Sequence, residues 1–330
     1  MKVAAVFVLV LVAFATRMSY TGAADPGAWE PTTAPPGLAT AGAEWIKIHG
    51  SSGHSFTAAV FRPAGEGPFP LVVILHGAGG IFPDYVQLAQ DFSRSGFMAV
   101  VGCWVVPLQP NPPACSEATT RAELVADPTL AAHDLIAASM MLPGAGDRVA
   151  LWGTSLGGWA AIWAAASTPQ IAAVVLDSAI HRCPCPLSQI APPSRNTTEV
   201  MSKLNMPILT FHGTADIVVA VEQSREFEAA ARAAGEPVTA LYYDGIGHTT
   251  ILPPAPGAPQ PRSRPITIGR AMSFLQSALA PFGSRDAAIS QARYFLSLDA
   301  AQPASTPATP AAPTTPAAVR PPSTGNAGLR

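Results

Sequence analysis

The sequence predicts an α/β fold in which a mostly parallel sheet of eight strands is flanked by helices. Short apolar runs that end in glycine or in a polar residue alternate along the chain with segments of helical periodicity. Runs of this kind suit strands that are covered on both faces. The chain has 330 residues, of which 48% are hydrophobic, so it can bury the large core that such a sheet requires.

The expected strands begin with a hairpin. Residues 44–50 (EWIKIHG) and 55–63 (SFTAAVFRP) are predicted to be its two strands. The remaining strands are compact apolar runs, which predict burial on both faces: residues 70–77, 97–104, 148–153, 171–179, 207–213 and 238–245.

Helical periodicity lies between these strands, in residues 131–142, 157–167, 221–235 and 270–282. A further amphipathic segment, residues 285–298, is expected to pack on the outside. We therefore expect one α/β domain that covers residues 44–300.

The N-terminus has the composition of a secretory signal peptide, which we place at residues 1–24. Lys2 precedes an apolar block from Val3 to Ala15, which is shorter than the ~20 residues needed to span a bilayer. Cleavage is expected after Ala15 or Ala24, and an uncleaved membrane anchor is the alternative. The protein is thus expected to be secreted, periplasmic or held in the cell envelope, without stable membrane insertion once the signal is cleaved.

Two further segments differ from the domain in composition. Residues 25–43 are rich in proline and glycine and are predicted to be a linker. Residues 301–330 are rich in proline, alanine and threonine and are predicted to be a disordered tail.

The cysteines fit an exported protein. The chain has four, Cys103, Cys115, Cys183 and Cys185, and an even number in an oxidising compartment predicts two disulfides. Since one proline separates Cys183 from Cys185, these two are expected to pair outward with Cys103 and Cys115, although the sequence leaves the pairing open. A metal site is disfavoured because neither a CxxC pair nor a matching histidine spacing is present. No cofactor is expected.

The charge balance argues against a nucleic-acid partner. Nineteen basic and 21 acidic side chains give a net charge of −2, and no basic run could follow a phosphate backbone.

One short motif indicates nucleophilic chemistry. The segment Gly153–Gly157 (GTSLG) follows a predicted strand and precedes a helix rich in small residues, so it fits G-x-S-x-G. In that motif the serine lies on a sharp turn, and the glycines let strand and helix approach each other. Ser155 is therefore the predicted nucleophile.

A serine hydroxyl needs a base, and two polar residues after later strands complete a set. Asp216 and His248 follow the strands at 207–213 and 238–245, which gives the order Ser, Asp, His along the chain. His248 is the predicted base, and Asp216 the acid that orients it. Asp177 and Asp244 are the alternative acids.

The predicted oxyanion hole consists of two backbone N–H groups. One belongs to Leu156, directly after the serine. The other belongs to Ala78, or alternatively Gly79, in the glycine-rich segment HGAGG after an expected strand.

Four segments carry a family resemblance: LVVILHGAGG, DRVALWGTSLGGWAA, ILTFHGTADIVV and YYDGIGHTT. They resemble the corresponding blocks of the dienelactone hydrolase family of α/β-hydrolases, over about residues 44–283. The resemblance implies an α/β-hydrolase fold, with Ser155, Asp216 and His248 as the triad and Ala78 and Leu156 as oxyanion donors. Dienelactone hydrolases proper use a cysteine nucleophile, and the serine here resembles that of related esterases.

The sequence thus predicts an exported serine hydrolase that acts on small carboxylic esters through an acyl-enzyme. A serine peptidase, an acyltransferase and a non-catalytic binding protein of the same fold are the alternatives. The excursion from Ile180 to Leu204 is too short for an independent helical cap, so we expect a minimal lid.

Overall fold

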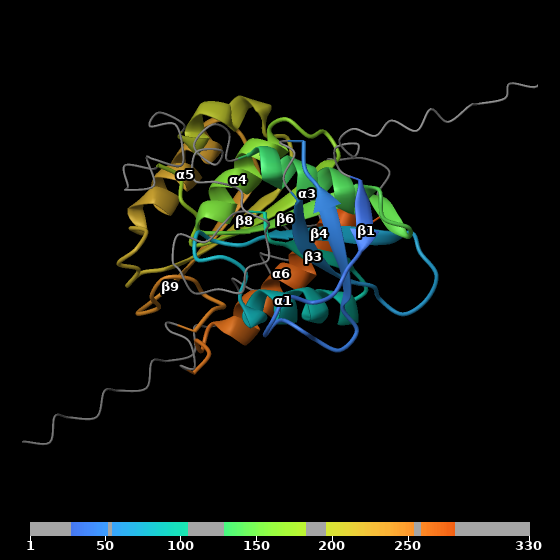
Figure 1. Ribbon diagram of the computed structural model, residues 1–330. Helices are drawn as coiled ribbons and strands as arrows, with labels where there is room; N and C mark the ends of the chain where they lie inside the picture. The colour runs from blue at the N-terminus through green and yellow to red at the C-terminus, as the bar shows by residue number, and fades with distance from the viewer. Residues whose placement is uncertain (1–27, 52–54, 105–128, 183–195, 254–258, 281–330) are drawn as a thin grey trace, which may run out of the picture.

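The computed structural model describes residues 28–51, 55–104, 129–182, 196–253 and 259–280. These residues form a mostly parallel sheet with helices on both faces (Figure 1). The strands are β1 (Trp29–Pro31), β2 (Glu44–His49), β3 (Ser55–Phe61), β4 (Phe69–Leu75), β5 (Met98–Gly102), β6 (Ala145–Thr154), β7 (Ile171–Asp177), β8 (Ile208–Gly213) and β9 (Val238–Tyr243). The fold is therefore the predicted α/β-hydrolase type.

The helices divide between the two faces of the sheet. One face carries α3 (Leu130–Met140), α4 (Leu156–Ala165) and α5 (Glu222–Ala233), and the other carries α1 (Pro83–Arg94) and α6 (Arg264–Leu279) (Figure 1). A short 3-10 helix, η2 (Thr197–Lys203), follows β7. Among the helices of the described ranges, none is both long enough and apolar enough to span a membrane.

The strand order is β1-β2-β3-β5-β4-β6-β7-β8-β9, in which the first three strands are antiparallel to their neighbours and the rest are parallel. The register aligns the last residues of successive strands: Thr154 of β6 lies opposite Asp177 of β7, which lies opposite Phe211 of β8. The loops after these strands therefore leave the sheet at one edge, where an open parallel sheet binds ligands.

The predicted count of eight strands is wrong, because the sheet of the described residues has nine. The additional strand, β1, lies in the segment expected to be a linker, and its register pairs Trp29 with Ile48. Leu38 of the same segment is buried in the core. The proline-rich composition predicted a linker, but proline is tolerated on an edge strand, and β1 is an edge strand of three residues.

Helix α1 is a second element that the sequence prediction missed. It begins with Pro83 at its first turn, a position that proline favours. Its buried residues, among them Tyr85, Leu88 and Phe92, face the sheet. The expected signal peptide, the segment 285–298 and the C-terminal tail lie outside the described residues, so these predictions stay open.

Candidate active site

Ser155 lies at the sharp turn that joins β6 to α4. Its backbone has φ 54° and ψ −116°, a left-handed conformation that is costly for a residue with a side chain. Two backbone hydrogen bonds fix this turn to the end of β7: the Ser155 N–H donates to Asp177 O at 3.0 Å, and the Ile180 N–H donates to Ser155 O at 3.0 Å. The serine is therefore held by its neighbour strand as well as by its own.

Glycines allow the close approach that this turn requires. A Cβ at Gly157 would lie 2.0 Å from Leu75 O, and one at Gly153 would lie 2.5 Å from Gly157 O. No side chain fits at either position. A Cβ at Gly77 would lie 3.2 Å from the Cβ of Ser155, so the loop after β4 packs directly against the serine.

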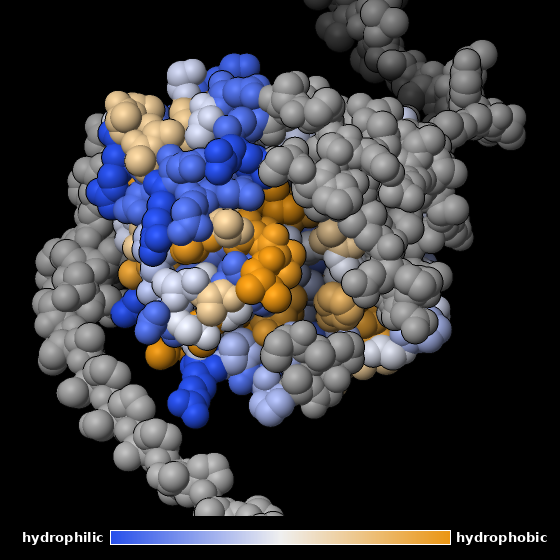
Figure 2. Space-filling view, turned by 90° about the vertical axis from the view of Figure 1, so that its left-hand side faces the viewer, coloured by the Kyte–Doolittle hydropathy of each residue, from blue (hydrophilic) through white to orange (hydrophobic). Residues whose placement is uncertain are grey.

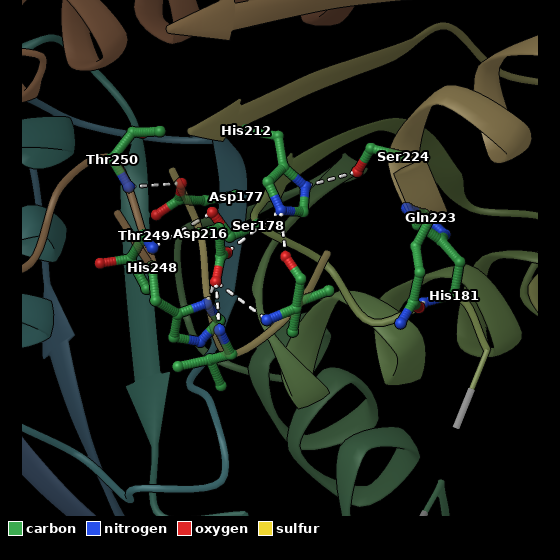
Figure 3. Close-up of polar contacts among 12 residues, drawn as sticks. Asp177, Ser178, His181, His212, Asp216, Gln223, Ser224, His248, Thr249 and Thr250 are labelled. Atoms are coloured by element: carbon green, nitrogen blue, oxygen red, sulfur yellow. Dashed lines mark hydrogen bonds and ion pairs between the residues drawn. The ribbon is translucent and has the colours of Figure 1, made fainter. Parts of the chain in front are cut away.

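Asp216 and His248 form a hydrogen-bonded pair. The His248 Nδ1–H donates to Asp216 Oδ2 at 2.8 Å (Figure 3). The other oxygen, Oδ1, accepts the backbone N–H groups of Val218 at 2.8 Å and Val219 at 2.9 Å. Burial by itself would raise the pKa of Asp216, but hydrogen bonds from His212 and His248 outweigh it and hold this pKa well below its usual range. The carboxylate is thus ionised and oriented.

The alternative acids are engaged elsewhere. Asp177 Oδ1 accepts the Thr250 N–H at 2.8 Å, and Asp244 Oδ1 accepts the Thr214 hydroxyl at 3.0 Å. Of the three candidate acids, Asp216 is the one that accepts a hydrogen bond from His248.

The loop that carries His248 is tied to the same strand end as the serine. The Thr249 N–H donates to Ser178 Oγ at 3.1 Å, beside the bond from Thr250 to Asp177. Ser155, Ser178 and Thr249 are the non-glycine residues with positive φ in the described ranges, so this strain gathers at one place. No hydrogen bond joins Ser155 to His248 within the described residues, and such bonds often form only in the complex with substrate.

The two expected oxyanion donors also lie beside the serine. Leu156 is the first residue of α4, where a backbone N–H has no partner within the helix. Ala78 lies in the loop after β4 that packs against Ser155. In the described part of the chain, the N–H groups of Ala78 and Leu156 donate to no protein acceptor.

The sequence prediction missed three buried residues around this site. His212 contacts the acid Asp216, with 3.1 Å between Nε2 and Oδ2. His76, at the end of β4, donates from Nδ1 to Gly77 O at 2.7 Å, and burial lowers its pKa to about 4. The Tyr85 hydroxyl accepts the Gly77 N–H at 3.1 Å and so fixes the loop. A histidine four residues before the predicted acid was the one sequence signal for His212.

One of the four cysteines, Cys103, lies in the described part of the chain. Among the described residues, no group of three or more His, Cys, Asp or Glu side chains could hold a metal ion. Cys103 follows β5, is buried and is disulfide-bonded. The other three cysteines lie outside the described residues, so the pairing stays a prediction.

Comparisons with solved structures support the fold. A puromycin-hydrolysing peptidase of Mycobacterium tuberculosis has a TM-score of 0.56 and 20% identity, over 74% of this chain and 41% of the peptidase. Acetyl xylan esterase 1 from Thermoanaerobacterium has a TM-score of 0.52 and 18% identity, over 68% of this chain and 83% of the esterase. A dienelactone hydrolase-like promiscuous phosphotriesterase from metagenomic libraries has a TM-score of 0.58 and 16% identity, over 72% of this chain and 100% of that one.

These identities are low, so the likeness concerns the fold. The chain spans less than half the length of the peptidase. A search of curated proteins found no match. A family model does match, that of the dienelactone hydrolase family, over residues 56–258. This match includes Ser155, Asp216 and His248 and covers more than half of the chain, so the protein belongs to the dienelactone hydrolase family of hydrolases.

Proposed function

We propose that the protein is an exported serine hydrolase that cleaves small carboxylic esters through an acyl-enzyme. The observation that carries this proposal is the pairing of His248 with Asp216, in a loop tied to the same end of β7 that holds the strained Ser155. Within the described residues, the N–H groups of Ala78 and Leu156 donate to no protein acceptor. Because Nδ1 of His248 donates to Asp216, Nε2 is left as the nitrogen that can accept a proton.

The reaction follows from these positions. Ser155 Oγ attacks the ester carbonyl carbon, and its proton passes to His248 Nε2. The carbonyl oxygen becomes an oxyanion that accepts the N–H groups of Ala78 and Leu156. The C–O bond to the alcohol breaks, and the alcohol leaves with the proton from His248. Water then attacks the acyl-serine, gives a proton to His248 and releases the carboxylic acid, while the proton on His248 returns to Ser155.

Asp216 has two roles in this scheme. Its ionised carboxylate holds the ring of His248 in one tautomer and stabilises the imidazolium that forms during each proton transfer. It does not itself take up the proton.

The surface near the acid supports an ester with an alkyl part. Ile217 and Val218 directly follow Asp216 and are 97% and 67% exposed. The side of the molecule that carries α5 and β9 shows apolar side chains next to hydrophilic ones (Figure 2). Because the excursion after β7 is short in sequence, we expect little apolar wall for a long acyl chain, and each unburied methylene forgoes about 0.8 kcal/mol. We therefore expect esters of about two to six acyl carbons to be preferred.

A panel of substrates tests the proposal. p-Nitrophenyl esters of graded acyl length are compared with aminoacyl p-nitroanilides, using wild type, Ser155→Ala and Ser273→Ala. Ser273 is the control because it is exposed in α6, where its hydroxyl donates to Gly269 O. We expect short esters to have the highest kcat/KM, and Ser155→Ala to lose about 10³-fold or more.

The same panel can contradict the proposal. Hydrolysis by Ser155→Ala at the wild-type rate rules out the serine mechanism. Preferred cleavage of the anilides indicates a peptidase, and preference for acyl chains of about twelve carbons rules out the open site.

A further inference from the structure

A second histidine contacts the proposed catalytic acid from inside the core. His212 lies in β8 and is fully buried. Its Nε2 is 3.1 Å from Asp216 Oδ2, the oxygen that also accepts the hydrogen bond from His248, and 2.9 Å from Val219 O. Its Nδ1 is 2.7 Å from the hydroxyl of Ser224 in α5 (Figure 3).

The partners of His212 determine where its protons are. Nε2 faces a carboxylate and a carbonyl, and because both are acceptors only, Nε2 must carry a proton. When the ring carries this one proton, Nδ1 accepts the proton of the buried Ser224 hydroxyl. The Nε2–H donates to Val219 O and also lies 3.1 Å from Asp216 Oδ2, so His212 links Ser224 to the carboxylate that accepts the hydrogen bond from His248.

This arrangement completes the set of donors to Asp216. Oδ1 accepts two backbone N–H groups from Val218 and Val219, and Oδ2 lies within reach of two imidazole N–H groups. A carboxylate with donors on both oxygens cannot rotate without breaking one of these bonds. Its negative charge is also shared between His248 and His212.

We propose that His212 is a positioning residue, which fixes the orientation of Asp216 and limits how strongly its charge attracts the protonated ring of His248. The proposal rests on the proposed function, because it concerns the same acid and base. Ser224 acts through His212 by fixing its tautomer.

Loss of the His212 N–H has two expected effects. The carboxylate becomes free to turn, so fewer molecules have His248 aligned, and kcat falls with little change in KM. The carboxylate also attracts the protonated His248 ring more strongly, so a higher pH is needed to free the base. Asp216 contacts His212 directly, and His248 shares that carboxylate. In the described part of the chain, Asp177 and His181 are further titratable groups that interact with His212. All four are unchanged in the variants below.

The test compares His212→Leu with His212→Gln. Leucine fills the space without a donor, whereas the glutamine amide can place an N–H near the position of Nε2. For His212→Leu we expect a kcat about 10 to 100-fold lower, a KM within about twofold of wild type and the acid limb of kcat/KM shifted to higher pH. We expect His212→Gln to recover most of kcat and to restore the pH profile. The role of Ser224 predicts a smaller loss of kcat in Ser224→Ala.

Proton NMR gives a readout that does not depend on activity. The His248 Nδ1 proton shared with Asp216 is followed as a downfield resonance, which we expect to shift in His212→Leu and to return toward wild type in His212→Gln. If wild type hydrolyses none of the esters, the proposed function fails, and the resonance alone decides whether His212 acts on Asp216. An unmoved resonance and pH profile in folded His212→Leu would overturn the proposal. If that variant does not fold, an unmoved resonance and wild-type kcat in Ser224→Ala would overturn it.

Discussion

At the scale of single residues, the molecule concentrates its costly features at the ends of β6 and β7 and in the loop after β9. The three described non-glycine residues with positive φ lie there, together with the buried carboxylate of Asp177. Among the described residues, Asp177 Oδ2 has no hydrogen-bond partner. Burial raises the pKa of this carboxyl to about 6, with the hydrogen bond from Thr250 opposing the shift. Such groups reduce stability, and their clustering fits a site maintained for function.

The raised pKa of Asp177 predicts how stability depends on pH in Asp177→Asn. Above pH 6 the folded wild type holds a buried charge that the unfolded chain, with a pKa near 3.8, exposes to water. Asparagine carries no charge at any pH. The free energy of unfolding of the variant relative to wild type should therefore rise between pH 4 and pH 8, by on the order of 2 kcal/mol.

Urea denaturation at several pH values measures this difference. Asp147→Asn serves as the control, because Asp147 is exposed in β6. A difference between Asp177→Asn and wild type that stays constant from pH 4 to pH 8 would show that the buried carboxyl does not titrate as we expect.

At the scale of elements, the decisive contact is that of α4 with the ends of β4 and β6. The helix begins directly after Ser155, and Gly157 and Gly158 bring its first turn against the sheet. A Cβ at Gly157 would meet backbone atoms of Leu75, which cannot move as a side chain could. The position of the serine therefore depends on the absence of a side chain two residues later.

Two glycine-to-alanine substitutions test this contact. Gly157→Ala should lower the free energy of unfolding by about 3 kcal/mol or more, because the strand and helix must separate. Gly269→Ala in α6 is the matched control, since a Cβ there meets nothing within 4 Å. It should raise stability by about 0.5–1 kcal/mol, because alanine favours the helix. Equal stability of Gly157→Ala and wild type in chemical denaturation would contradict the close approach.

Elements with a strong local pattern could be predicted from the sequence, and others could not. The strands β4 to β9 were found because each is an apolar run that ends at glycine or a polar residue. The expected burial of β9 on both faces is wrong, because β9 is an edge strand whose residues after Val238 are half-buried. Helix α1 and strand β1 were missed. Strand β1 has only three residues, and it is a strand because it pairs with β2, not because its residues favour strands locally. The location of Ser155, Asp216 and His248 at one edge of the sheet could be predicted, because each follows a strand and parallel strands end at one edge. The contact of His212 with Asp216 could not be predicted, because it depends on which carboxylate oxygen of Asp216 faces the core.

At the scale of the whole molecule, the proposed export accounts for two features, the signal-like N-terminus and the even number of cysteines. Cys103 is buried at the end of β5 and is disulfide-bonded, which fits an oxidising compartment. We therefore expect the protein from its native host to begin near residue 16 or residue 25, as cleavage after Ala15 or Ala24 requires. We also expect it to contain no free thiol after denaturation.

Mass spectrometry of the native N-terminus and thiol titration measure both features. Reduction should lower the melting temperature, because each cross-link typically contributes about 2–4 kcal/mol. An intact residue 1 together with four titratable thiols, in protein taken from its native compartment, would contradict export.

The measurement that tests the central claim most directly is covalent labelling by a fluorophosphonate, which reacts with an activated serine. Intact mass and peptide mapping of the wild-type protein should give one adduct, on Ser155, that accompanies loss of ester hydrolysis. Ser155→Ala should give none, and the control Ser273→Ala should label like wild type. An unlabelled wild type that hydrolyses esters, or an adduct on a serine other than Ser155, would contradict the account.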